Sequence, residues 1–138
     1  MKISATIRHQ HRDQNITVST NGMEQSLNIK AKTEGRGSSV NGGELLFLAL
    51  ATCYCNDVYR EAAKIDMTID SVTVEVNGEF GGAGEPAKQI IYNVIVDAPY
   101  PEEQVMKLIR EVDRVAEIHN TLRQGIPVSL VSARHIRN

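Results

Sequence analysis

The sequence lacks tryptophan, has only two phenylalanines and four tyrosines, and shows no large excess of charge of one sign. Its 138 residues include 15 basic and 17 acidic side chains, which give a formal net charge of −2 at pH 7. Proteins that bind nucleic acid usually combine a basic surface with aromatic side chains on which bases stack. This composition therefore argues against nucleic acid as a partner.

Long apolar runs are also missing. Residues 1–11 are too polar for the apolar part of a signal peptide, and the apolar run that begins at Leu45 is too short to span a membrane. We expect a cytoplasmic protein without a membrane partner, in a compartment where thiols stay reduced. With 41% apolar and 23% charged residues, and no repeat or linker, residues 1–138 are expected to form a single domain.

Only two cysteines are present, and both lie in one predicted helix. Good helix formers continue without proline or glycine over residues 44–64. Because successive residues of a helix are about 100° apart, Cys53 shares a face with Asp57 and Arg60, whereas Cys55 points nearly the opposite way. The Cβ atoms of the two cysteines diverge, so these residues cannot form a disulfide with each other. Asp57 disfavours a Cys53 thiolate, and Arg60 is expected to be solvated.

Short β-type runs surround this helix. They cover residues 3–8, 16–20, 25–31, 69–76, 90–96 and 126–136. Asn21-Gly22 favours a tight hairpin between the second and third runs. A second helix is predicted from Pro101 to Gly125, with an apolar stripe that contains His119. The order of three strands, helix, two strands, helix and strand indicates an α+β fold with antiparallel β-sheets.

The start of the first helix is apolar on every face, over residues 45–51. A helix that is apolar on every face must be buried on all sides, and the short strands of one chain are too few to bury it. We therefore expect a homodimer that buries this central helix between its subunits.

Three short motifs stand out in the two predicted helices. The first helix contains Gly-Glu-Leu-Leu at 43–46 and Ala-Leu-Ala-Thr-Cys-Tyr at 49–54, and the second contains His-Asn-Thr-Leu-Arg at 119–123. The first two resemble the start and centre of the cysteine-bearing helix of the OsmC and organic hydroperoxide resistance (Ohr) superfamily, and the third is similar to the segment after its second cysteine. The order of elements agrees along the whole chain. The resemblance implies an OsmC-like fold, with antiparallel sheets, a buried central helix and an intertwined homodimer.

The resemblance also implies roles for individual residues. Cys53 falls on the peroxidatic cysteine, whose thiolate attacks an organic hydroperoxide and becomes a sulfenic acid. Glu44, nine residues earlier, falls on a glutamate that pairs with an arginine beside the thiolate. Arg12 is the best match for that arginine, with Arg8 and Arg36 as competitors. Such an enzyme needs no cofactor, and its partners are the hydroperoxide and an external thiol or dithiol reductant.

One position departs from the superfamily's pattern. Ala116 falls where the resolving cysteine is normally found. Without a thiol there, a sulfenic acid on Cys53 cannot close to an internal disulfide and needs an external thiol. Two hypotheses of different classes follow. The protein is a hydroperoxide reductase that works with Cys53 alone, or a non-catalytic relative whose dimeric pocket binds an apolar or electrophilic small molecule.

His119 and Cys55 have two interpretations each. His119 lies one turn from Ala116, so it can stabilise a Cys53 thiolate, or it can be a satisfied histidine of the core or interface. We read Cys55 as core packing, since a buried cysteine behaves as a small apolar residue. A metal site formed by Cys53, Cys55 and His119 lacks the ligand count of structural zinc. We therefore expect no metal.

Overall fold

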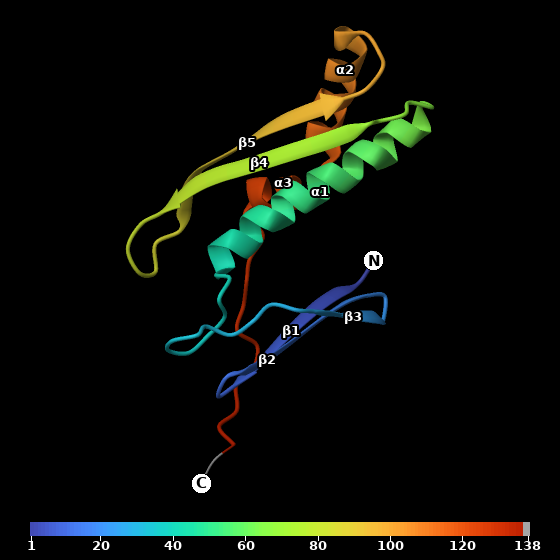
Figure 1. Ribbon diagram of the computed structural model, residues 1–138. Helices are drawn as coiled ribbons and strands as arrows, with labels where there is room; N and C mark the ends of the chain where they lie inside the picture. Colours follow the sequence, from blue (N-terminus) through green and yellow to red (C-terminus); the bar gives the residue numbers. More distant parts are fainter. Residues whose placement is uncertain (137–138) are drawn as a thin grey trace. The chain divides into compact units, whose positions relative to one another are not determined.

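The computed structural model describes residues 1–136 and divides into two compact units (Figure 1). The first unit is Met1–Leu46, and the second begins at Phe47. Among the described residues, none of the helices has the length and apolar character needed to cross a membrane.

The first unit contains a three-stranded antiparallel sheet in the order β1-β2-β3. Its strands are β1 (Ile3–Gln10), β2 (Asp13–Thr20) and β3 (Met23–Leu27). Asn21 and Gly22 connect β2 to β3 with φ values of 51° and 81°. Two consecutive positive φ angles define the hairpin turn that asparagine and glycine adopt most easily, so the predicted tight hairpin is confirmed. The third strand ends earlier than predicted, because only residues up to Leu27 pair with β2.

Helix α1 (Gly42–Lys64) begins with a reciprocal pair of hydrogen bonds. The backbone N–H of Glu44 donates to Asn41 Oδ1 at 2.8 Å, and the N–H of Asn41 donates to Glu44 Oε1 at 3.0 Å. This is a capping box, which satisfies two backbone donors that lack a partner at a helix start. The helix therefore begins at this point in the sequence.

The second unit is built on a long antiparallel hairpin of β4 (Ser71–Phe80) and β5 (Ala87–Asp97). Helices α2 (Glu102–Val115) and α3 (Glu117–Gln124) follow it. The core joins apolar side chains of α1 and α2 to one face of the hairpin, namely Tyr54, Val58, Ala62, Val105, Leu108, Val112, Val72, Val74, Tyr92, Val94 and Val96. The alternating burial of β4 and β5 matches the period of two in the sequence. The predicted α+β fold with antiparallel sheets is thus confirmed.

Gly78 of β4 lies directly against a side chain of α1. A Cβ atom at Gly78 would lie 2.7 Å from the ring of Phe47, so the ring would have to shift to make room for it. The same ring stacks on Phe80 with a centroid distance of 6.0 Å. Glycine at position 78 therefore lets the N-terminal part of α1 in this unit pack tightly on the sheet.

The predicted second helix is in fact two helices. Ala116 has ψ of 112°, which breaks the helix between Val115 and Glu117. The N–H of Asn120 donates to the carbonyl of Ala116, and its side-chain amide donates to the carbonyl of Arg114. These bonds satisfy backbone groups at the break. The single-helix prediction was wrong because both segments pack with the same apolar periodicity, which does not reveal a change of axis. The predicted end at Gly125 is confirmed.

Two further expectations differ from the structure. Residues 126–136 form no strand, and their apolar side chains are exposed, with Val128 98% and Leu130 88% accessible. A strand needs a neighbour, and within residues 1–136 no strand pairs with this segment. Residues 45–51 are also not buried all round in the single chain, since Leu48 is 58% exposed.

Candidate functional site

Cys53 lies half-buried on the face of α1 that meets the start of α3. Its Sγ is 3.6 Å from Asp57 Oδ2, one turn further along α1. It is also 3.8 Å from Oε1 of Glu117, the first residue of α3. The structure therefore confirms that Cys53 and Asp57 share a face, and it adds a second carboxylate that the sequence pattern did not reveal.

Arg60 forms ion pairs with both of these carboxylates. Its guanidinium lies 3.2 Å from Asp57 Oδ1, 3.0 Å from Glu117 Oε2 and 2.8 Å from Glu61 Oε2. Arg60 is exposed, as expected, with 42% of its side chain accessible, but its ion pairs were not predicted. Positions 53, 57 and 60 share one helical face, so their proximity could be found from sequence. The approach of Glu117 is tertiary and could not.

The electrostatics of this cluster keep Cys53 protonated. Burial is the main cause that raises the pKa of the Cys53 thiol, and the carboxylates of Asp57 and Glu117 raise it further. The backbone N–H of Ile118 donates to Sγ and acts in the opposite direction. Burial and the neighbouring Glu117 raise the pKa of Asp57, whereas the hydrogen bond from Arg60 lowers the pKa of Glu117. At neutral pH the sulfur is a thiol beside two hydrogen-bond acceptors.

The break between α2 and α3 passes next to the thiol. Glu117 and Ile118 both contact Sγ, and Ala116, the residue before them, is fully buried. This is the segment in which the resemblance places a resolving cysteine at position 116. The chain thus brings the expected segment to Cys53 but carries a methyl group there instead of a thiol.

His119 is buried on another side of the same helix start. It is 4% exposed, and its ring packs against Tyr54 and Tyr92 at centroid distances of 6.0 and 4.8 Å. Neither ring nitrogen has a hydrogen-bond partner among the described residues. Burial is the main cause that lowers the pKa of His119, and Arg123 contributes. The groups that contact Cys53 do not include His119, so its action on the thiolate stays a prediction.

Glu44 and Arg12 have other partners in the structure. Glu44 closes the capping box of α1 with Asn41. Arg12 donates to the carbonyl of Thr33 at 2.5 Å, at the edge of a hollow of about 480 Å³ in the first unit. Arg36 donates to the carbonyl of His11. The catalytic roles that the resemblance implies for Glu44 and for an arginine stay predictions.

Cys55 points away from the acidic cluster, as the helical geometry predicts. It lines a hollow of about 290 Å³ with Leu48, Ala51, Thr52, Asn56, Val72 and Val74. None of these neighbours is charged. The apolar surroundings agree with the interpretation of Cys55 as a packing residue.

Three possible metal ligands come together at the same cluster. Among residues 1–136, the ligand atoms of Cys53, Asp57 and Glu117 lie within 4.8 Å of one another. This is not the set of Cys53, Cys55 and His119 considered from the sequence. Arg60 already pairs with both carboxylates, so a cation would have to displace its guanidinium.

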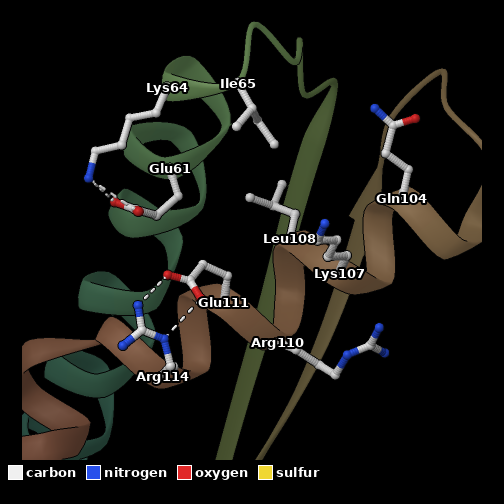
Figure 2. A pocket seen from close by; sticks show the side chains of 9 residues that line it. All are labelled: Glu61, Lys64, Ile65, Gln104, Lys107, Leu108, Arg110, Glu111 and Arg114. Carbon is white, nitrogen blue, oxygen red and sulfur yellow. Dashed lines mark hydrogen bonds and ion pairs between the residues drawn. The ribbon is translucent and has the colours of Figure 1, made fainter.

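A wide hollow of about 660 Å³ lies between the end of α1 and α2. Figure 2 shows its acidic residues paired with basic ones, Glu61 with Lys64 and Glu111 with Arg114. Its remaining lining is Ile65, Gln104, Lys107, Leu108 and Arg110, without a thiol or an imidazole. This hollow therefore offers no thiol, and the Cys53 cluster stays the candidate site.

The fold and the cluster define a small α+β protein with a half-buried thiol, Cys53, where α1 meets the start of α3. The sequence profile described as "OsmC-like protein" matches residues 35–131. The chain therefore belongs to the OsmC-like family. Among curated proteins no match was found.

Solved structures show the same fold at low sequence identity. An OsmC-like protein from Mycoplasma pneumoniae is 21% identical with a TM-score of 0.61, covering 91% of this chain and 87% of its own. The organic hydroperoxide resistance protein OhrB of Bacillus subtilis is 16% identical with a TM-score of 0.55, covering 91% and 93%. An organic hydroperoxide resistance protein from Elizabethkingia anophelis is 14% identical with a TM-score of 0.59, covering 91% and 90%.

Proposed function

We propose that this protein reduces organic hydroperoxides through Cys53 alone, with an external thiol or dithiol as reductant. The observation that carries the proposal is the half-buried Cys53 thiol, 3.6 Å from the Asp57 carboxylate, in a member of the OsmC-like family. Solved structures with this fold include proteins named for organic hydroperoxide resistance, which supports the substrate class. Bulky apolar hydroperoxides are expected to be better substrates than hydrogen peroxide.

The chemistry begins with removal of the thiol proton. Asp57 accepts the proton of Cys53, and its raised pKa makes it a stronger base than an ordinary carboxylate. The thiolate attacks the terminal oxygen of the hydroperoxide, an S–O bond forms, and the O–O bond breaks. The leaving alkoxide takes the proton from Asp57, which gives an alcohol and a Cys53 sulfenic acid. Two external thiols then return the sulfenic acid to the thiol and release water and a disulfide.

Arg60 positions the proton acceptor in this scheme. Its ion pairs with Asp57 and Glu117 hold both carboxylates at the sulfur and offset their mutual repulsion. Glu44 and one of the arginines Arg12, Arg8 and Arg36 are proposed as a second pair that stabilises the thiolate, as the resemblance implies.

We further propose that the active form is a homodimer. Leu48 of α1 and the apolar side chains of residues 126–136 are exposed in the single chain. A stable dimer that covers them is expected to bury at least about 2,000 Å² in total. Light scattering at micromolar concentration is expected to give twice the mass of one chain, and a monomer would contradict this proposal.

A specific observation favours a second candidate, a non-catalytic protein that binds an apolar or electrophilic small molecule. Reactive cysteines usually have a lowered pKa, whereas the pKa of Cys53 is raised, and Ala116 supplies no resolving thiol. Under this alternative, the protein binds its ligand without turnover.

Consumption of cumene hydroperoxide with a dithiol reductant separates the two candidates. Cys53→Ser is expected to lower the rate by about 100-fold or more, because the nucleophile is lost. The matched control Cys55→Ser is expected to keep the wild-type rate within about twofold. Equal rates for wild-type and Cys53→Ser protein, at the level of the uncatalysed reaction, would overturn the peroxidase proposal.

A further inference from the structure

Another hollow on the same unit has a different chemistry from the Cys53 cluster. It measures about 210 Å³ and is lined by Leu50, Ile90, Tyr92, His119, Leu122 and Arg123. Leucine and isoleucine side chains from α1, β5 and α3 supply its apolar walls. The lining contains no cysteine and no acidic residue.

His119 gives this hollow an unusual polar group. His119 is only 4% exposed, yet neither Nδ1 nor Nε2 has a hydrogen-bond partner within residues 1–136. A buried polar group without a partner destabilises the fold, so native structures rarely leave one unpaired. Its ring is fixed edge-on to Tyr92, which orients the imidazole without satisfying it. Both nitrogens are covered by neighbouring side chains, so a ligand in the hollow supplies the missing partner only if those side chains shift.

The charged groups near His119 are already neutralised. Arg123 donates to Asp113 Oδ1 at 2.8 Å and to Asn120 Oδ1 at 3.1 Å. The hydroxyl of Tyr92 donates to the same Asp113 carboxylate. Burial keeps the imidazole uncharged at neutral pH, because it lowers the pKa of His119. The hollow therefore presents no free charge for an anion or a cation.

The size of the hollow limits the ligand further. A cavity of about 150 Å³ with aliphatic and aromatic walls takes one benzene molecule. The hollow here, at about 210 Å³, is large enough for one such ring with a small substituent. Because a neutral imidazole has one donor and one acceptor nitrogen, a hydroxyl group can pair with either of them.

We propose that this hollow binds a small neutral aromatic alcohol, with the ring between Leu50, Ile90 and Leu122 and the hydroxyl on His119. The site does not depend on turnover by Cys53, so its binding is measured without peroxide. Failure of the peroxidase proposal would leave it unaffected, and the reverse also holds.

Titration of the wild-type protein with p-cresol and with toluene tests the proposal. The two molecules differ only by the hydroxyl, and NMR of the His119 ring nitrogens reports where they bind. We expect p-cresol to bind about tenfold more tightly than toluene and to shift the His119 signals, because one hydrogen bond is gained. Benzoate is expected not to bind, since the hollow holds no free cation.

Two variants sharpen the test. His119→Phe is expected to reduce the preference for p-cresol over toluene from about tenfold to about onefold, because the hydrogen-bonding group is lost. Cys53→Ser is expected to bind p-cresol as the wild type does. Equal affinity of the wild type for p-cresol and toluene, or no shift at His119 up to millimolar p-cresol, would overturn the proposal. The wild-type comparison alone decides this if His119→Phe does not fold.

Discussion

The two faces of α1 surround two cysteines, only two residues apart, with opposite environments. The Cys53 face holds Asp57 and Arg60 and meets Glu117, whereas Cys55 faces a hollow without a charged residue. Both sulfurs are half-buried, so burial alone does not distinguish them. What differs is the presence of a proton acceptor and a cation that holds it in place. Helical phase, more than depth, therefore gives the two thiols different surroundings.

The largest expected effect comes from adding the missing thiol on the Cys53 face. Ala116→Cys is expected to form a disulfide with Cys53 after peroxide treatment, because residues 117 and 118 already contact Sγ. An intramolecular thiol has a much higher effective concentration than a free one, so turnover with a dithiol reductant should rise by about tenfold or more.

Non-reducing peptide mapping checks this bridge, with Ala116→Ser as a control of similar size. Wild-type protein is expected to accumulate sulfenic or sulfinic Cys53 instead of an internal disulfide. If the Ala116→Cys variant folds as the wild type does but forms no bridge, position 116 is not the resolving position.

A smaller effect is expected from changing the charges around Cys53. Arg60→Met removes the cation that pairs with Asp57 and Glu117. The negative charge of these carboxylates is then less compensated, so the pKa of Cys53 should rise and less thiolate should form. Glu117→Gln removes one of these carboxylates and should have the opposite effect. At pH 8 we expect alkylation of Cys53 by iodoacetamide to fall about threefold in the first variant and to rise about threefold in the second.

Cys55 is the internal control for these variants, since its alkylation should not change. Lys64→Met is a second control, because Lys64 pairs with Glu61 at 2.9 Å and does not contact Cys53. Equal alkylation rates of Cys53 in all three variants would show that its environment is not electrostatically controlled.

The cysteine face shows how far the sequence could predict the site. The rotation of 100° per residue correctly separated Cys53 from Cys55 and placed Asp57 beside Cys53. It could not predict the contacts of Glu117 and Ile118, because they depend on the break at Ala116. No proline or glycine marks that break, and the apolar stripe continues through it.

The fold shows a similar division. Asn21-Gly22 predicted its hairpin because the backbone preference of these residues is local. Residues 126–136 have the composition of a strand but no neighbouring strand within the described chain, and pairing is not a local property. Leu48 was expected to be buried, yet it is 58% exposed in the single chain, and only the proposed dimer would cover it.

His119 and Asp57 are expected to change the free energy of unfolding with pH in opposite directions. Because burial lowers the pKa of His119, the unfolded chain binds a proton more readily than the folded one. The contribution of His119 to the free energy of unfolding is therefore complete above its pKa in the unfolded chain, about 6.5. This contribution is lost as the pH falls through the lower pKa of the folded state. One such group changes the free energy of unfolding by at most about 1.4 kcal/mol per pH unit.

Denaturant unfolding at pH 7.5 and 5.5 measures this loss. His119→Phe is expected to lose less stability than the wild type over this interval. Asp57 has a raised pKa, so its contribution to the free energy of unfolding changes with pH in the opposite direction. That change begins at the ordinary aspartate pKa of about 3.9. The same pH dependence in wild type and variant would exclude His119 as the cause.

The smallest expected effect concerns the start of α1. Glu44→Ala removes half of the capping box and should lower the free energy of unfolding by about 1 kcal/mol. Glu44→Gln can still accept the bond from Asn41 and should retain most of the stability. Thermal unfolding compares the two variants. If Glu44 also acts at the thiol, both variants should lower peroxide turnover, whereas only the alanine variant should lower stability.

The most direct test of the central claim is the location of the first oxidised sulfur. Wild-type protein is exposed briefly to cumene hydroperoxide together with a dimedone-type sulfenic acid trap, and its peptides are analysed by mass spectrometry. We predict that the trap is found on Cys53 and not on Cys55, because only Cys53 has a proton acceptor at 3.6 Å. A trap found on Cys55 alone would contradict the assignment of the reactive face.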